Sequence, residues 1–162
     1  MIWTKDNIKN LDNNTKLQWF DVYNYGLLED RGYEPSILSD VELLEIKSNI
    51  KNDYLNYLNN LGNDPNFLFY YILESGYEFI SVCRLIKDKD KVVVEGLETH
   101  RDYRKQGYGF EVIKATIDYA REINIKVLYA VVRQHNTASL RTFIKSGFEL
   151  YDEDETNVYL IY

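Results

Sequence analysis

The residues with the clearest chemical potential lie in the stretch RDYRKQGYGFEVIKATIDYA, residues 101–120. It begins with basic side chains, passes through Gly107 and Gly109, and continues with the apolar spacing of a helix. A glycine inside a helix is less favourable than an alanine by roughly 1 kcal/mol. Two glycines where a helix should begin therefore indicate that something must approach the backbone closely.

A strand end, a glycine-containing loop and an amphipathic helix together make an anion site. The first turn of a helix carries unpaired N–H groups and the positive end of the helix dipole. Glycines let a ligand reach that backbone without a Cβ in the way. Arg101, Arg104 and Lys105 add positive charge there, in a chain whose formal net charge is -7. We predict that this loop binds a diphosphate.

Two common phosphate motifs do not fit this loop. GYGFEVIK lacks the Gly-Lys-Ser/Thr ending of a Walker loop. A dinucleotide-binding fingerprint requires a third glycine. The glycine pattern is short and occurs by chance in other chains, so a second motif is needed to interpret it.

That second motif is VVRQHNTASLRTFIKSGFEL, residues 131–150. Asn136 can cap a helix start, and Gly147 can end the helix before a strand that begins at Phe148. We expect Leu140, Phe143 and Ile144 to face inward from this helix.

Taken together, the two motifs resemble the GNAT N-acetyltransferase superfamily. Its acyl-CoA motif, Arg/Gln-x-x-Gly-x-Gly/Ala, is matched by Arg104, Gly107 and Gly109. Its later motif is matched by Asn136, Ser139, Lys145, Gly147 and Phe148. The strand before the loop matches through Leu97, Thr99, Tyr103 and Arg104, with Arg101 in the place of a proline. The resemblance covers residues 91–148 well and the preceding strands loosely.

The resemblance implies an α/β fold, with a mixed, mostly antiparallel central sheet flanked by helices and splayed at the acyl-CoA site. It implies acetyl-CoA as the acyl donor and no metal. Backbone groups near Leu97 and Thr99 would pair with the pantetheine arm, and Gly96 would begin the splay with a β-bulge. The residues implied to bind the cofactor are Leu97, Thr99, Arg104, Lys105, Gln106, Gly107, Tyr108, Gly109, Phe110 and Asn136.

The implied reaction requires two proton transfers, one from the attacking amine and one to the departing thiolate. An alkyl amine, whose pKa is near 10.4, must lose a proton before it attacks. Glu98 is the favoured acceptor of that proton and Glu95 the second candidate, with His100 behind them. Strand alternation places the two glutamates on opposite faces unless a bulge intervenes.

The second demand is a proton for the departing thiolate, which a tyrosine of the later motif often supplies in the family. Here Phe143 occupies that position and has no proton to give. Ser139 lies one turn earlier on the same helix face and is the expected substitute. Water or the incoming amine are the alternative sources.

The acceptor can be a small amine, an aminoglycoside-like cation or a protein N-terminus, and the negative net charge favours a small cation. Two other functions stay open. One is a domain of the same fold that binds acyl-CoA as a sensor without turnover, and the other is a phosphate-binding domain outside the family.

Several elements must position these residues. Apolar spacing predicts helices over residues 15–32 and 39–61, the latter with a Ser39–Glu42 capping box and an inward face ending at Leu61. Three β-rich runs, 67–73, 77–86 and 91–99, predict an antiparallel meander. We then expect a helix over 107–122 that buries Phe110, a strand over 126–133, a helix over 136–146 and two closing strands.

The 162 residues are expected to form one domain, with residues 1–65 as a helical substrate-side region and 66–162 as the sheet and acyl-CoA-binding core. The C-terminal run TNVYLIY either pairs across a homodimer as an edge strand or lies inside the sheet.

Composition excludes several classes of protein. The acidic balance argues against a nucleic-acid partner, and no apolar run approaches the roughly 20 residues that span a bilayer. One cysteine, Cys83, leaves no internal disulfide and no Cys-rich metal site. The first residues lack the features of a signal peptide, so a cytoplasmic location is expected.

Overall fold

The computed structural model describes residues 1–30, 32–33, 37–76 and 78–162. Its seven described strands form one sheet in the order β1-β2-β3-β4-β5-β7-β6. Only β4 and β5 are parallel among these neighbouring strands. The elements are β1 (Ile2–Thr4), α1 (Lys5–Asn10), α2 (Asn13–Asp30), α3 (Asp40–Leu61), β2 (Phe67–Ser75), β3 (Glu78–Asp88), β4 (Lys91–Thr99), η1 (Arg101–Tyr103), α4 (Tyr108–Glu122), β5 (Tyr129–Arg133), α5 (Thr137–Lys145), β6 (Glu149–Glu153) and β7 (Asn157–Ile161).

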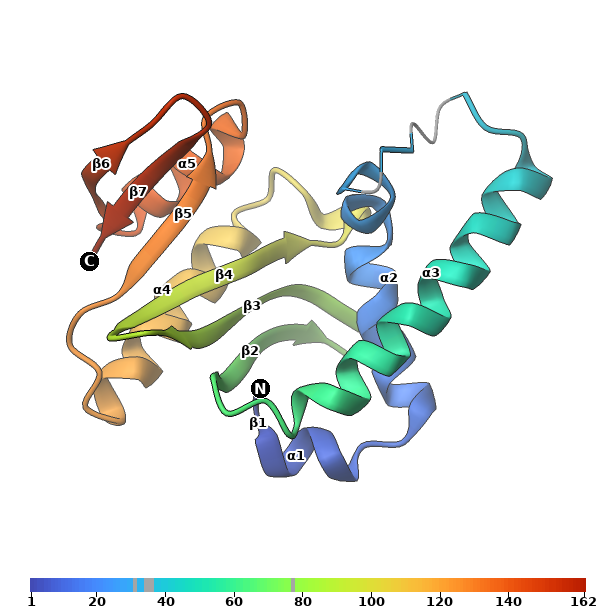
Figure 1. The fold of residues 1–162 in the computed structure, drawn as a ribbon, viewed down its shortest axis with the longest axis horizontal. Helices are drawn as coiled ribbons and strands as arrows, with labels where there is room; N and C mark the ends of the chain where they lie inside the picture. Colours follow the sequence, from blue (N-terminus) through green and yellow to red (C-terminus); the bar gives the residue numbers. More distant parts are fainter. Residues whose placement is uncertain (31, 34–36, 77) are drawn as a thin grey trace.

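The expected fold class is confirmed. Helices α2 and α3 cover one face of the sheet, and α4 and α5 lie behind the other (Figure 1). The meander β2–β3–β4 is antiparallel throughout, as its three β-rich runs predict. The N-terminal strand β1 was not predicted, because three residues are too few to show a period of two.

The N-terminal helices pack through apolar side chains on one face of the sheet. Ser39 and Glu42 form the expected capping box, in which the Glu42 carboxylate accepts from Ser39 N at 3.0 Å. The buried residues of α3 are Ile50, Tyr54, Leu58 and Leu61. Of the first predicted helix, Phe20 and Leu28 are buried, whereas the side chains of Tyr23, Asn24 and Leu27 lie outside the described residues.

On the opposite face, α4 buries Val112, Ile113, Thr116, Ile117 and Ala120. Two expectations about this face are wrong. Phe110 is only half-buried and lies under the Lys145 ammonium, 4.8 Å from its ring centre, because it sits where the first turn of α4 meets the surface. Ile144 is 46% exposed, because the inward face of the short helix α5 is taken by Phe143 and Leu140.

The C-terminal strand β7 lies inside the sheet, between β5 and β6. The edge-strand interpretation of TNVYLIY is therefore wrong. The edge is β6, whose five residues are all exposed. It carries Glu149, Asp152 and Glu153, charges that disfavour pairing with the same strand of another copy.

Cys83 lies in the core between β3 and α4. Its side chain is fully buried, and its Sγ lies 2.9 Å from Thr116 Oγ1. Burial raises the pKa of the Cys83 thiol to about 12, because the low-dielectric surroundings disfavour the thiolate.

This environment makes Cys83 inert in the native protein. At pH 8 we expect Ellman's reagent to label no thiol until denaturant is added, and then to label one per chain, because the thiolate is the reactive form. Stoichiometric labelling in native buffer at the rate of a free thiol would contradict this packing.

Candidate functional site

The site is built where β4 and β5 separate. In the continuous stretch from residue 78 onward, these strands pair only at Val93–Tyr129 and Val94–Ala130. Beyond that point β4 runs on to Thr99 and β5 to Arg133, and the two ribbons diverge (Figure 1). The far half of β4 therefore has an edge that β5 does not cover. This is the splay that the sequence led us to expect.

A β-bulge begins the separation. Arg84 of β3 pairs with Glu95, but Val82 pairs with Glu98, so one residue of β3 opposes two of β4. Gly96 lies in the bulge with φ 60°, a left-handed conformation that suits glycine. The bulge expected at Gly96 is present, and it bends β4 away from the direction of its neighbour.

The bulge also changes which face the two glutamates occupy. Residues opposite one another in an antiparallel pair share a face, and Val82 and Arg84 share a face because they are two apart on β3. Glu95 and Glu98 consequently lie on the same face, the one covered by the N-terminal helices, since Val82 belongs to their core. Regular alternation would have separated them.

Glu95 is engaged in an ion pair. Its Oε1 accepts from Nε and Nη2 of Arg84, both at 2.6 Å. The same guanidinium contacts the hydroxyls of Tyr57 and Tyr70. Glu95 thus belongs to a polar network between α3 and the sheet.

Glu98 is held differently, at the open edge of β4. Its Oε1 accepts from Arg104 Nη2 at 2.9 Å and from Thr99 N at 3.2 Å. Arg104 Nε donates to Thr99 O at 3.1 Å. Arg104 is therefore turned back onto the strand rather than outward from the loop. His100 is used locally, because its Nδ1 accepts from Asp102 N and caps η1.

The loop before α4 has the backbone geometry of an anion site. Lys105 and Gly107 both have positive φ, 64° and 94°, and Gly107 is the N-cap of α4. Within the described part of the chain, the N–H groups of residues 105–109 donate to no protein acceptor; the first α4 amides that do are those of Phe110 and Glu111, which bond Gly107 O. Such a run of unpaired N–H groups at a helix start binds anions.

The two glycines of the loop have different reasons to be glycine. A Cβ on Gly107 would meet no described atom within 4 Å, so its positive φ is what requires glycine there. Gly109 has ordinary helical φ, and a Cβ there would lie 3.5 Å from Thr99 Oγ1 and 3.7 Å from Thr142 Cγ2. These are normal van der Waals distances, so no neighbouring protein atom requires glycine at position 109. That a bound donor requires a bare backbone there stays a prediction.

We accordingly expect Gly109→Ala to fold as well as the wild type. The added methyl fills available space, and alanine favours a helix over glycine by up to about 1 kcal/mol. Chemical denaturation should show an unfolding free energy that is unchanged or raised. A loss of more than about 2 kcal/mol, in the range of overpacked cores, would contradict the contacts described for this glycine.

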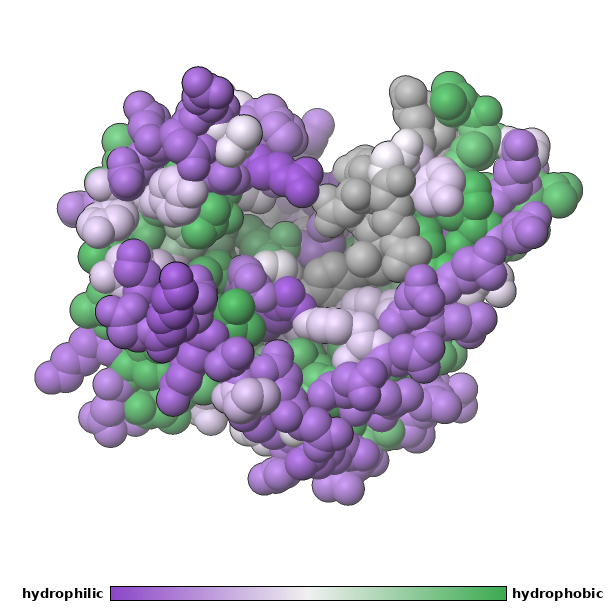
Figure 2. Space-filling view, viewed as in Figure 1, coloured by the Kyte–Doolittle hydropathy of each residue, from purple (hydrophilic) through white to green (hydrophobic). Residues whose placement is uncertain are grey.

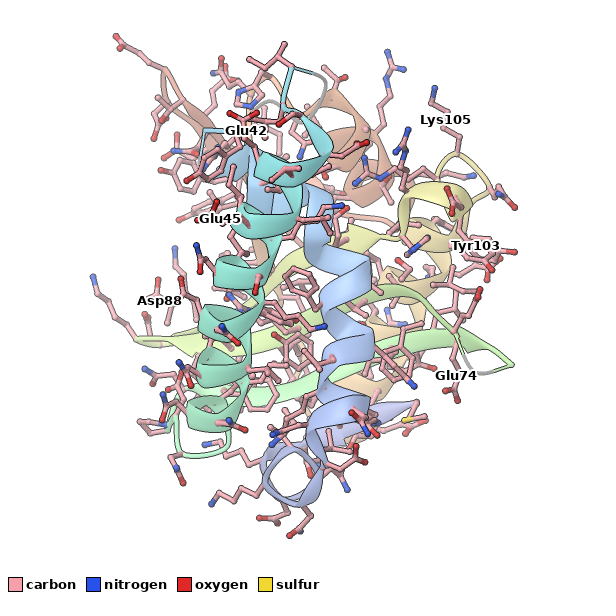
Figure 3. The ribbon with its side chains drawn as sticks, turned by 90° about the vertical axis from the view of Figure 1, so that its right-hand side faces the viewer. Glu42, Glu45, Glu74, Asp88, Tyr103 and Lys105 are labelled. Atoms are coloured by element: carbon pink, nitrogen blue, oxygen red, sulfur yellow. The ribbon has the colours of Figure 1, made fainter. Side chains whose placement is uncertain are left out.

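The charged side chains around the loop divide into two groups. Arg104 faces the strand, whereas Lys105 projects away from the body of the protein, above Tyr103 (Figure 3). Tyr103 donates to Glu78, which raises the pKa of the Tyr103 hydroxyl by that hydrogen bond and by charge repulsion. Lys105 and Arg101 are both exposed and add positive charge on either side of Arg104 in the chain.

Helix α5 borders the site with its first turn. Asn136 caps it, since its Oδ1 accepts from Ser139 N at 3.1 Å. Ser139 is half-buried, and its hydroxyl bonds to no group among the residues that the structure describes. Phe143 is buried and packs edge-on against Phe148, with ring centres 5.1 Å apart. Phe143 is thus a core residue and offers no hydroxyl.

An open cavity of about 740 Å³ lies beside the same end of β5. Figure 2 shows the surface hollowed between the C-terminal hairpin and the N-terminal helices. Asp154 shapes the β6–β7 turn at its rim, and hydrogen bonds from Tyr159 and the turn hold the pKa of the Asp154 carboxyl well below its usual range. The cavity is lined by Arg133, Gln134, His135, Glu155, Thr156 and Asn157.

Among the residues that the structure describes, no group of three or more His, Cys, Asp or Glu side chains is arranged to hold a metal ion. None of the described helices has the length and apolarity to cross a membrane.

Comparison with known protein families gives a match over most of the chain. The family model described as "Acetyltransferase (GNAT) family" matches residues 36–148. No curated protein sequence matches the chain.

Solved structures share the fold. An acetyltransferase from Thermus thermophilus is 17% identical, with 94% of this chain and 92% of that one covered and a TM-score of 0.68. The N-acetyltransferase PseH of Campylobacter jejuni, in complex with acetyl coenzyme A, is 22% identical, with 76% and 86% covered and a TM-score of 0.61. The PaiA N-acetyltransferase of Thermoplasma acidophilum, in complex with coenzyme A, is 14% identical, with 99% and 96% covered and a TM-score of 0.59.

Proposed function

This chain belongs to the acetyltransferase (GNAT) family, and we propose that it transfers an acetyl group from acetyl-CoA to a primary amine. The observation that carries the proposal is the set of unpaired N–H groups at residues 105–109, in front of the open space at Gly107. Those groups would hold the diphosphate of the donor. Membership of the family removes the alternative of an unrelated phosphate-binding domain.

Other backbone groups fit the rest of the donor. The edge of β4 beyond Val94, including Leu97 and Thr99, is not covered by β5 and would pair with the amides of the pantetheine arm. Asn136, exposed at the start of α5, would contact the donor from the β5 side. When bound, acetyl-CoA supplies the acyl group as a thioester.

Side chains of this protein would carry out the two proton transfers, one from the amine and one to the leaving thiolate. Glu98 would accept the proton that the amine loses as it forms the C–N bond. Ser139, whose hydroxyl has no partner within the described chain, would protonate the sulfur that leaves as the C–S bond breaks, and would regain its proton from water. Glu95 is the second candidate for the base, because the bulge places it on the same face as Glu98.

The acceptor would approach from the face that carries the two glutamates. That face belongs to α2 and α3 (Figure 3), so residues 1–65 would form the substrate side and residues 66–162 the acyl-CoA-binding core. The net charge of -7 favours a small cationic amine over a protein N-terminus. A cytoplasmic location remains a prediction.

A second function is favoured by one observation. Phe143 is buried and cannot donate a proton, which fits a domain that binds acyl-CoA as a sensor without turnover.

Two measurements separate these functions. CoA or acetyl-CoA at 100 times Kd stabilises a binding protein by about 2.7 kcal/mol, which raises Tm by roughly 5–10 °C for a chain of this size. With a panel of amines, an enzyme releases thiol from acetyl-CoA faster than the amine-free control. A raised Tm without amine-dependent release would support the sensor, and no change in Tm would contradict both functions.

A further inference from the structure

We infer that Glu98 and Arg104 form a latch on the open edge of β4, which the acyl donor displaces as it binds, so that donor binding separates Glu98 from Arg104. The inference rests on the proposed function. It makes Arg104 a positioning residue for the base rather than a direct ligand of the diphosphate.

The backbone of Thr99 faces the separation between β4 and β5. In an antiparallel ladder, successive residues point their N–H and C=O groups alternately toward and away from the partner strand. His100 N donates to Ile80 O of β3 at 2.7 Å. The neighbouring groups of Thr99 therefore point away from β3, toward the edge that β5 leaves uncovered.

The latch satisfies both of those backbone groups. Thr99 N donates to Glu98 Oε1 at 3.2 Å, and Thr99 O accepts from Arg104 Nε at 3.1 Å. The two side chains are joined by the Arg104 Nη2–Glu98 Oε1 contact at 2.9 Å. Together they occupy the positions that hydrogen bonds from a neighbouring strand would fill.

A ligand that pairs with Thr99 must therefore remove the latch. An amide of the pantetheine arm cannot accept from Thr99 N while Glu98 does, and Arg104 already fills one of the two acceptor positions of Thr99 O. The side chain of Arg104 is 41% exposed and that of Glu98 is 21% exposed, so water reaches the pair from the Arg104 side and screens it in part. A ligand already anchored at residues 105–109 can displace such a pair. The carboxylate of Glu98, no longer bonded to Arg104 and Thr99 N, would then accept a proton from the amine.

The test compares a ligand that reaches Thr99 with one that does not. CoA carries the pantetheine arm, whereas adenosine 3′-phosphate 5′-diphosphate carries only the nucleotide and the diphosphate. We expect Arg104→Met to bind CoA about three- to tenfold more tightly than the wild type in calorimetric titration. Binding of the short ligand should change less than twofold. Glu98→Gln, which removes the charge and keeps the shape, should show the same selective gain.

Arg101→Met is the matched control, because it removes one positive charge from the same segment, whereas the described side-chain bonds to the Thr99 backbone come from Glu98 and Arg104. Its effect should be equal on the two ligands. Equal weakening of both ligands by Arg104→Met would overturn the inference and make Arg104 a diphosphate ligand, while leaving the proposed function intact. Failure of the wild type to bind CoA would overturn the proposed function and the inference with it.

Discussion

Gly107→Ala is expected to raise KM for acetyl-CoA at least tenfold. Gly107 has φ 94°, and a left-handed conformation is unfavourable for alanine by roughly 1–2 kcal/mol. We expect the loop to relieve that strain by turning the N–H groups of residues 105–109 away from the position where they would bind the diphosphate. A loss of about 1.4 kcal/mol in binding free energy corresponds to a tenfold weaker affinity. Steady-state kinetics at saturating amine, together with the Kd for CoA, measure the effect.

Gly76→Ala separates loss of the site from loss of stability. Gly76 also has positive φ, 62°, and a Cβ added there would meet no described atom within 4 Å, but it belongs to the β2–β3 connection. We expect the two variants to lose similar stability while Gly76→Ala keeps the wild-type KM. A KM raised equally in both, or unchanged in Gly107→Ala, would contradict the role of the 105–109 amides.

The second large effect is expected from Glu98→Gln. A positioned general base contributes roughly 10²–10⁴-fold to the rate, so kcat at pH 7 should fall at least 100-fold. The loss should shrink as the pH approaches about 10.4, where the amine is deprotonated without help. KM for acetyl-CoA should not rise, because the substitution also opens the latch. A pH–rate profile of both proteins measures all three quantities.

Glu95→Gln is the comparison for this prediction. The substitution removes a carboxylate that lies on the same face of the sheet as Glu98. The Glu95 carboxylate forms an ion pair with Arg84, and Glu95 follows Val94, the last β4 residue that pairs with β5. We expect its kcat to fall less than tenfold. A larger loss for Glu95→Gln than for Glu98→Gln would assign the base to Glu95, and wild-type rates for both would leave neither glutamate as the base.

The sequence predicted those elements whose physical signals are local. The β-rich runs 67–73, 77–86 and 91–99, separated by the short breaks ESG and KDKDK, predicted the meander. Gly107 and Asn136 predicted where α4 and α5 begin, since both residues are used as caps. The family resemblance added the splay between β4 and β5, which no local pattern contains.

The features of the site that the sequence did not predict depend on contacts between residues far apart in the chain. The side on which Glu95 and Glu98 lie follows from one bulge, and its position is a matter of register with β3. The packing of α5 on α4, which brings Thr142 Cγ2 to 3.7 Å from the position of a Cβ on Gly109, is not contained in the glycine motif. The latch on Thr99 depends on how Arg104 returns across η1, and its motif position gave no sign of that.

Binding of the diphosphate by the loop before α4 is tested most directly by a crystal structure of the protein with CoA. We predict that the diphosphate oxygens accept hydrogen bonds from N–H groups within residues 105–109, in front of Gly107. A diphosphate bound elsewhere, or a 104–109 turn closed over by its own side chains, would contradict this binding site and the acetyl transfer proposed from it.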